Sequence, residues 1–232
     1  MVSGLAVRKR VNWRQTFRII RSIFPPIHLF EDIADPRDWE ALASVEAKTN
    51  PRLRFEIGDL GKVPPARRVS GPGASFVMAP FVHCSPLRPG RFTDGTYGIY
   101  YAGDREEVAL AETIHHHQKF MRCTDEAPGW TSDFRVLVGN IDRHLEDVNA
   151  VSDVLDRDDY TASQIEGRAL RTAGSDGLVW ESVRMQGGQC IAAFWPDVVS
   201  IPVQGRHYGY HWNGDRVDFV RQYDTGRVLS VN

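Results

Sequence analysis

The side chains best suited to chemistry lie between Arg91 and His117. Arg91 precedes two adjacent tyrosines, Tyr100 and Tyr101, and Glu112 follows them. An arginine holds a pyrophosphate through two parallel hydrogen bonds, and a tyrosine ring offers a surface for stacking. A carboxylate stabilises positive charge that develops on a sugar carbon. This set of residue types suits the binding of a dinucleotide and chemistry at its glycosidic bond.

The two tyrosines occupy successive positions of a predicted strand, so their rings point to opposite faces. One ring can belong to the core while the other faces a cleft, and the sequence leaves the choice between Tyr100 and Tyr101 open. Glu112 stands in an otherwise apolar helical segment, residues 108–114. A carboxylate buried there needs a partner, as in many functional sites, whereas the alternative is a helix position that faces solvent.

Ser182 and three histidines are the other candidates. Ser182 shares a strand face with Leu178 and Trp180, and its hydroxyl group can bond an amide or a ribose hydroxyl. It lacks the Gly-x-Ser-x-Gly context of a hydrolase nucleophile. His115–His117 are consecutive on a helix and point about 100° apart, so they cannot all bind one ion. We therefore expect no metal site, with a metallohydrolase that uses these histidines as a distant alternative.

Composition restricts the classes of protein. The 232 residues are 42% hydrophobic and 25% charged, with a net charge of −2 and three cysteines. These values predict one globular domain that needs no disulfide or metal, and they argue against direct binding of nucleic acid. No apolar run reaches the roughly 18 residues of a membrane-spanning helix, and no secretory signal is evident. We expect a cytoplasmic protein of bacterial type with reduced thiols.

The spacing of apolar residues and the turn signals predict the helices and strands that position these side chains. The mixture of hairpins and helices predicts an α+β fold, a single domain with mixed or antiparallel central sheets flanked by helices. We expect residues 1–14 to form a loose arm and residues 15–232 to form the domain. The predicted helices cover residues 35–48, 104–121 and 161–174. The predicted strands cover residues 16–20, 75–82, 98–102, 134–141, 178–183, 190–195, 198–203, 208–212 and 216–223.

Local signals mark three boundaries in this scheme. Asp104 with Glu107 forms a predicted capping box at the start of the central helix. Asn213–Gly214 predicts a type I′ turn between the last two strands. Apolar side chains of that hairpin, Tyr208 and Trp212, are expected to form an exposed patch for a partner.

Several segments, in this order, resemble the longer form of the RES-domain family, which is named after an Arg, a Glu and a Ser in one pocket. The likeness spans roughly residues 15–205, and its specificity comes from the order and spacing of the blocks. The blocks are residues 16–31, 38–40, 46–52, 90–113 and 175–184. Phe92–Thr93 replaces the Trp-Asn of many shorter members. This difference leaves open which molecule would accept the group that the family's reaction transfers.

The resemblance implies a fold similar to that of ADP-ribosyltransferases of the diphtheria-toxin kind and a reaction that consumes NAD⁺. Family members look like toxins of toxin–antitoxin pairs, whose antitoxin carries an Xre-like DNA-binding part. The implied catalytic residues are Arg91, Glu112 and Ser182. The expected substrate-binding residues are Tyr101 or Tyr100, together with Arg18 and Arg52 as candidate phosphate contacts.

The resemblance implies transfer of ADP-ribose to a protein acceptor, such as an enzyme of nucleotide metabolism. The alternatives are an NAD⁺ glycohydrolase or phosphorylase, since water and phosphate attack the same carbon, and a non-enzymatic module that only binds its antitoxin. Residues 57–75 and 142–160 are candidate loops for docking a protein target.

Overall fold

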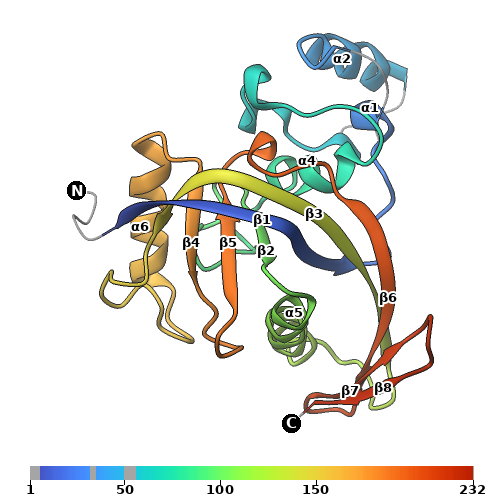
Figure 1. The fold of residues 1–232 in the computed structure, drawn as a ribbon. Coiled ribbons are helices and arrows are strands. Elements are labelled where there is room, and N and C mark those ends of the chain that lie inside the picture. The colour runs from blue at the N-terminus through green and yellow to red at the C-terminus, as the bar shows by residue number, and fades with distance from the viewer. Residues whose placement is uncertain (1–5, 32–34, 50–55, 232) are drawn as a thin grey trace.

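The computed structural model describes residues 6–31, 35–49 and 56–231 (Figure 1). Eight strands form the sheet: β1 Val7–Arg21, β2 Tyr100–Gly103, β3 Thr131–Asp147, β4 Gly177–Glu181, β5 Gln189–Ala193, β6 Val203–Trp212, β7 Val217–Gln222 and β8 Val228–Ser230. The α-helices named here are α1 His28–Glu31, α2 Trp39–Thr49, α4 Ala74–Val82, α5 Glu106–Met121 and α6 Thr161–Thr172. Short 3₁₀ turns are η1 Leu60–Lys62, η2 Pro65–Arg67 and η3 Pro196–Val198.

The strands form one sheet in the order β1-β2-β5-β4-β3-β6-β7-β8. β1 also pairs with β3, so the pairings of β1, β2, β5, β4 and β3 close into a ring, and β6, β7 and β8 extend from it. The β3–β4 pair is parallel and the other strand pairs among the described residues are antiparallel. The predicted α+β domain with a mixed sheet and flanking helices is therefore confirmed.

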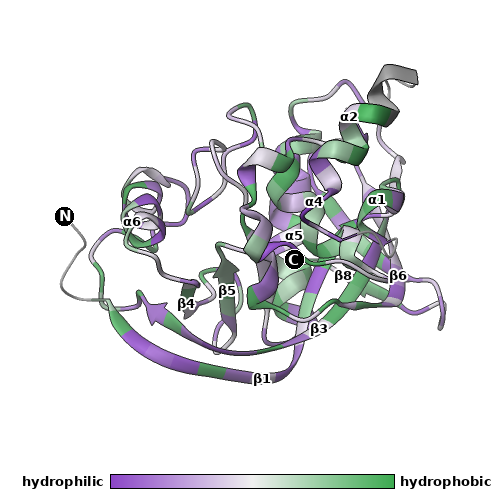
Figure 2. Ribbon diagram, turned by 90° about the horizontal axis from the view of Figure 1, so that it is seen from above, coloured by the Kyte–Doolittle hydropathy of each residue, from purple (hydrophilic) through white to green (hydrophobic). Residues whose placement is uncertain are grey.

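Helices cover both sides of the sheet. α4 lies on one side with α1 and α2, whereas α5 lies on the other (Figure 1). Strand β4 therefore has buried side chains on both of its faces. Val179 packs in a hydrophobic core together with residues of α4. Leu178 and Trp180 pack in a second core, which also includes Leu170 of α6. Figure 2 shows β5 as hydrophobic, as expected of a central strand, whereas β1 is largely hydrophilic.

The expectation of a loose arm is wrong for residues 7–14. They form the first half of β1 and pair with β3 from Val7 opposite Asp147 onward. The sequence hides this strand because seven of the first nine β1 residues are exposed and only Val11 is buried. Pairing with the long β3 strand, rather than an apolar pattern, orders this segment.

Two predicted strands are wrong. Residues 75–82 belong to helix α4, in which Phe76, Val77, Met78 and Phe81 are all buried. A segment that is apolar on every side has no period, so sequence cannot separate a buried helix from a buried strand. Residues 198–203 contain the end of η3 and irregular chain, and strand structure resumes only at Val203.

Two predicted turn motifs also differ in detail. Asp104 does not cap α5; Arg105 holds the cap position, and Asp104 Oδ1 instead accepts a hydrogen bond from the backbone N–H of Gln189 at 3.0 Å. The hairpin of β6 and β7 exists, but its loop has four residues because Trp212 pairs with Val217. A type I′ turn needs a positive φ at both central residues, and of Asn213–Gly214 only the glycine has one.

Candidate active site

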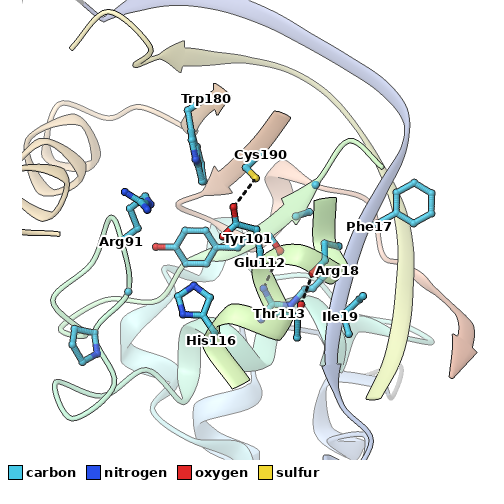
Figure 3. Close-up of a pocket in the computed structure, with 15 residues that line it drawn as sticks. Phe17, Arg18, Ile19, Arg91, Tyr101, Glu112, Thr113, His116, Trp180 and Cys190 are labelled. Atoms are coloured by element: carbon cyan, nitrogen blue, oxygen red, sulfur yellow. Dashed lines mark hydrogen bonds between the residues drawn. The ribbon is translucent and has the colours of Figure 1, made fainter. Parts of the chain in front are cut away.

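A pocket of about 320 Å³ lies where β1, β2 and α5 meet the turn before Phe92 (Figure 3). Its walls come from segments far apart in the chain, so the ring of strand pairings brings them together. β4 and β5 each contribute one side chain. The lining residues are Phe17–Ile19, Pro89–Arg91, Tyr101–Gly103, Ala109, Glu112, Thr113, His116, Trp180 and Cys190.

Glu112 is the carboxylate of the pocket. Ser182 Oγ donates a hydrogen bond to Glu112 Oε1 at 2.8 Å, and the Cys190 thiol lies 3.8 Å from the same oxygen. Burial, together with the charge of Glu112, raises the pKa of the Cys190 thiol, so the thiol keeps its proton. Both neighbours act as donors to the Glu112 carboxyl group and hold it in place. The expectation that a buried glutamate here needs a partner fits this arrangement.

Ser182 is fixed by the turn that follows β4. Its hydroxyl oxygen accepts hydrogen bonds from the backbone N–H groups of Arg184, at 3.2 Å, and Met185, at 3.1 Å. With two donors pointing at its oxygen, the serine directs its own proton to Glu112. The serine therefore orients the carboxylate and does not line the pocket wall itself.

Arg91 is 6% exposed, and its guanidinium group reaches the wall of the pocket. Nη1 donates to the backbone carbonyl oxygen of Asp156 and, at 3.5 Å, to that of Val154. The guanidinium carbon lies 4.4 Å from the centre of the Tyr160 ring. Among the described residues no carboxylate pairs with Arg91. The guanidinium group is therefore held in place by backbone oxygens and an aromatic ring.

The structure decides which tyrosine faces the pocket. Tyr101 lines it, whereas Tyr100 is 1% exposed and packs in the core on the α4 side of the sheet. The Tyr101 hydroxyl oxygen accepts a hydrogen bond from the backbone N–H of Phe92 at 3.0 Å. The Trp180 ring stands edge-on to Tyr101, with 6.3 Å between their centres. Burial raises the pKa of Tyr101, so its phenol stays neutral.

The two arginines expected to contact phosphate have different outcomes. Arg18 comes from β1 and lines the pocket; its Nη1 donates to the backbone oxygen of Tyr101 at 3.0 Å. Its guanidinium carbon lies 4.7 Å from the centre of the Tyr100 ring, and burial lowers its pKa. Figure 3 shows Arg18 and Arg91 at opposite ends of the pocket, with Tyr101 between them in this view. Arg52 lies outside the described residues.

The three histidines point to three different surroundings, as the helix geometry predicted. His116 lines the pocket. His117 packs against Phe134, with 5.0 Å between ring centres, and His115 Nε2 lies 3.0 Å from Arg184 Nη2. Burial, with added repulsion from His115 and nearby arginines, lowers the pKa of His116 to about 4. A neutral imidazole therefore faces the pocket at pH 7.

Sequence reasoning did not select Trp180, Cys190 and Tyr160 as residues of the site. The alternation of β4 could have indicated Trp180, because it shares a face with Ser182. Nothing in the sequence links Tyr160 to Arg91. The expected exposed patch at Tyr208 and Trp212 is wrong, since each side chain is 2% exposed.

The fold and the site together define a class, a small α+β domain whose sheet brings an arginine, a glutamate and a serine to one pocket. A family model described as the RES domain matches residues 65–213, more than half of the chain. The chain belongs to the RES-domain family. Arg91, Glu112 and Ser182 lie within the matched range, whereas Arg18 lies before it.

Two comparisons with individual proteins accompany this match. The chain is 30% identical over 210 residues to the uncharacterized protein y4oC of Sinorhizobium fredii (strain NBRC 101917 / NGR234), covering 90% of this chain and 87% of that protein. It is also similar to a chain of the solved M. tuberculosis MbcT–MbcA toxin–antitoxin complex. That likeness has a TM-score of 0.42 at 12% identity, covering 87% of this chain and 85% of the other. Over the described residues, no helix combines the length and apolar character needed to cross a bilayer.

Proposed function

We propose that this protein is the toxin of a toxin–antitoxin pair and an enzyme that consumes NAD⁺. In this proposal it cleaves the nicotinamide–ribose bond and transfers ADP-ribose to a protein acceptor. One observation carries the proposal: Ser182 donates a hydrogen bond of 2.8 Å to Glu112 at the pocket. The same pocket holds Arg91, which is buried and forms no ion pair with a carboxylate of the described residues. Membership of the RES-domain family supports the same substrate and the same residues.

Glu112 would stabilise the transition state. When the bond between ribose C1′ and the nicotinamide nitrogen breaks, the electron pair leaves with nicotinamide, which becomes neutral and needs no general acid. Positive charge then develops on the ribose, and a nearby carboxylate lowers the energy of that state. An acceptor hydroxyl or other nucleophile attacks C1′, and its proton passes to the Glu112 carboxylate. Ser182 keeps the carboxylate oriented through its hydrogen bond.

Arg91 would bind the pyrophosphate and fix the bend of the dinucleotide, which places C1′ near Glu112. Tyr101 and Trp180 would pack against the nicotinamide or ribose, since both rings face the pocket and are neutral. Arg18, at the other end of the pocket, is a second contact for phosphate or a ribose hydroxyl. Arg52 stays a candidate from the resemblance alone.

The acceptor is tested by incubating the purified protein with NAD⁺ labelled in its adenosine part, with and without phosphate and with and without cell lysate. Release of nicotinamide that requires lysate, with label on one protein band, supports ADP-ribosyl transfer. Release without lysate indicates the alternative NAD⁺-degrading reaction, and its dependence on phosphate separates phosphorolysis from hydrolysis. Absence of nicotinamide release in every arm overturns the enzymatic proposal and leaves a module that only binds its antitoxin.

The proposed partner is a cognate antitoxin with an Xre-like DNA-binding part, and the proposed location of both proteins is the bacterial cytoplasm. The net charge of −2 supports contact with DNA only through the antitoxin. Co-expression tests this: NAD⁺ should fall in cells with the toxin alone and be maintained when the antitoxin is present.

A further inference from the structure

A second groove, of about 390 Å³, lies on the side of α5 that faces away from Glu112. Leu110, Ala111 and Ile114 of α5 form its apolar floor. Residues of β7 and β8 form the opposite wall. It shares no lining residue with the pocket of Glu112. The groove is therefore a separate site.

One wall of this groove is an open sheet edge. β8 is the last strand of the sheet and pairs with β7 on its other side. Three consecutive residues, 229–231, line the groove, although side chains of successive strand residues point to opposite faces. Val231 packs against the core that contains Leu110, so the groove runs along one face of this strand end. Because Ser230 also lines the groove, the groove reaches the backbone edge of the strand as well. Figure 1 shows β7 and β8 at the end of the sheet near the C-terminus.

The register identifies which backbone groups of β8 have no partner within the described part of the chain. The N–H of Val231 donates to the oxygen of Asp218 at 2.9 Å, so residues 231 and 229 are those that bond β7. In an antiparallel pair, hydrogen-bonded and non-hydrogen-bonded positions alternate. The N–H and C=O of Ser230 therefore point away from β7, toward the open edge. An added strand would find one donor and one acceptor there.

Charge differs between the two ends of the groove. Arg157, His115 and Arg184 lie at one end, and Glu107 at the other. Arg184 is 8% exposed in its side chain and lies 3.6 Å from Asp158 Oδ1, which is on an exposed side chain. Arg157 is exposed, and none of the described acidic side chains forms an ion pair with it. The first end therefore attracts a carboxylate and the second repels one.

The length of the groove sets the size of its ligand. Glu107 and Gln118 both line it and lie eleven residues apart on α5, which is roughly 16 Å at 1.5 Å per residue. An extended peptide rises about 3.3 Å per residue, so about five residues fill this span.

We propose that this groove binds an extended peptide segment of a partner protein, about five residues long, with apolar side chains and a carboxylate at one end. The peptide backbone would pair with Ser230, its apolar side chains would pack on Leu110 and Ile114, and its carboxylate would meet Arg157 and Arg184. Addition of a strand to a sheet edge is an established mode of peptide recognition, in which the backbone gives affinity and pockets give specificity. This proposal is independent of NAD⁺ cleavage.

The test uses the full-length protein and a fluorescein-labelled probe peptide, acetyl-Leu-Val-Leu-Val-Asp-amide, with binding followed by fluorescence anisotropy. Two altered probes separate the contributions: one has asparagine for the aspartate, and the other has proline for the central leucine. We expect each change to weaken binding by roughly tenfold or more, because each removes a charged or backbone hydrogen bond.

Matched protein variants complete the test. Ser230→Pro removes an N–H that points away from β7, so no hydrogen bond between β7 and β8 is lost, whereas Ser230→Ala keeps that N–H. We expect the proline variant to bind the probe roughly tenfold more weakly than the alanine variant, at equal thermal stability. Arg157→Met should weaken binding similarly, whereas Arg14→Met, which alters an exposed arginine of β1, should not.

Saturable binding with this pattern supports the groove as a strand-addition site. Absence of binding by the unaltered probe overturns the proposal. Equal binding by Ser230→Pro and Ser230→Ala also overturns it, since the peptide would then not pair with β8. NAD⁺ turnover of the same samples, measured in parallel, shows that failure at the groove is separate from failure of the proposed enzyme activity.

Discussion

Replacement of His117 by leucine should make the protein more resistant to acid. His117 is 5% exposed, and its ring lies 5.0 Å from that of Phe134 and 6.0 Å from that of Tyr210. Its Nε2 atom is buried and has no hydrogen-bond partner in the described part of the chain. Burial, reinforced by the charge of Arg21, lowers the pKa of His117 from 6.5 to about 4. The folded protein therefore keeps this imidazole neutral.

The sign and size of the effect follow from these two pKa values. Below pH 6.5 the unfolded chain binds a proton at His117 that the folded protein does not bind, so the free energy of unfolding falls as the pH falls toward 4. Each pKa unit corresponds to about 1.4 kcal/mol, so the difference between 6.5 and about 4 gives a total loss of at most about 3.5 kcal/mol. Leucine fills a similar volume in an apolar cluster and cannot be protonated. The His117→Leu variant should therefore lack this part of the acid sensitivity.

The assay is urea unfolding followed by tryptophan fluorescence at several pH values between about pH 7.5 and pH 4. The stability difference between His117→Leu and wild type should widen as the pH falls. His207→Leu, which changes an exposed histidine, is the control and should run parallel to wild type. Parallel curves for His117→Leu and wild type would refute the assignment of a lowered pKa to this buried ring.

Three further predictions concern the pocket and the packing of α6 against Phe92. Ser182→Ala should lower the rate of nicotinamide release roughly 10- to 100-fold, because a hydrogen bond to a charged group contributes about 1.5–3 kcal/mol, and an unchanged rate would exclude a role for the serine in orienting Glu112. Gly167→Ala should lower the melting temperature, since a Cβ atom there would lie only 2.3 Å from the backbone oxygen of Phe92; a thermal melt like that of wild type would contradict this. Trp180→Leu should raise the KM for NAD⁺ about tenfold with a smaller change in kcat, because the indole forms part of the pocket wall; an unaltered KM would remove Trp180 from the binding site.

Local patterns were sufficient for much of the fold. The 104–121 prediction agrees closely with α5 (Glu106–Met121), and the hairpin around Asn213–Gly214 has the expected strands. The predicted strand over residues 75–82 failed because α4 is buried on all sides and carries no periodic signal. The first half of β1 was missed because its order comes from pairing with β3, a partner more than 100 residues away.

The candidate site, like the fold, could be predicted only in part, because some of its features depend on contacts between distant segments. The sequence offered Glu112 and Ser182 only as candidates, and the resemblance to the RES-domain family selected them. Alternation along β2 required that only one of Tyr100 and Tyr101 face a cleft. Which one does so depends on the packing of α4 against the sheet, which sequence alone does not reveal. Tyr160 holds Arg91 from a loop 69 residues away in the chain, and such a contact depends on tertiary structure alone.

The most direct test of the account is the rate of NAD⁺ cleavage by Glu112→Gln. Glutamine keeps the shape of the side chain and can still accept from Ser182, but it carries no negative charge for the transition state. We expect a loss of roughly 100- to 1,000-fold or more in nicotinamide release, with urea unfolding unchanged at pH 7.5. Glu126→Gln, which alters an exposed glutamate after α5, should retain the wild-type rate. Wild-type activity in Glu112→Gln would contradict the central claim that this carboxylate carries the chemistry.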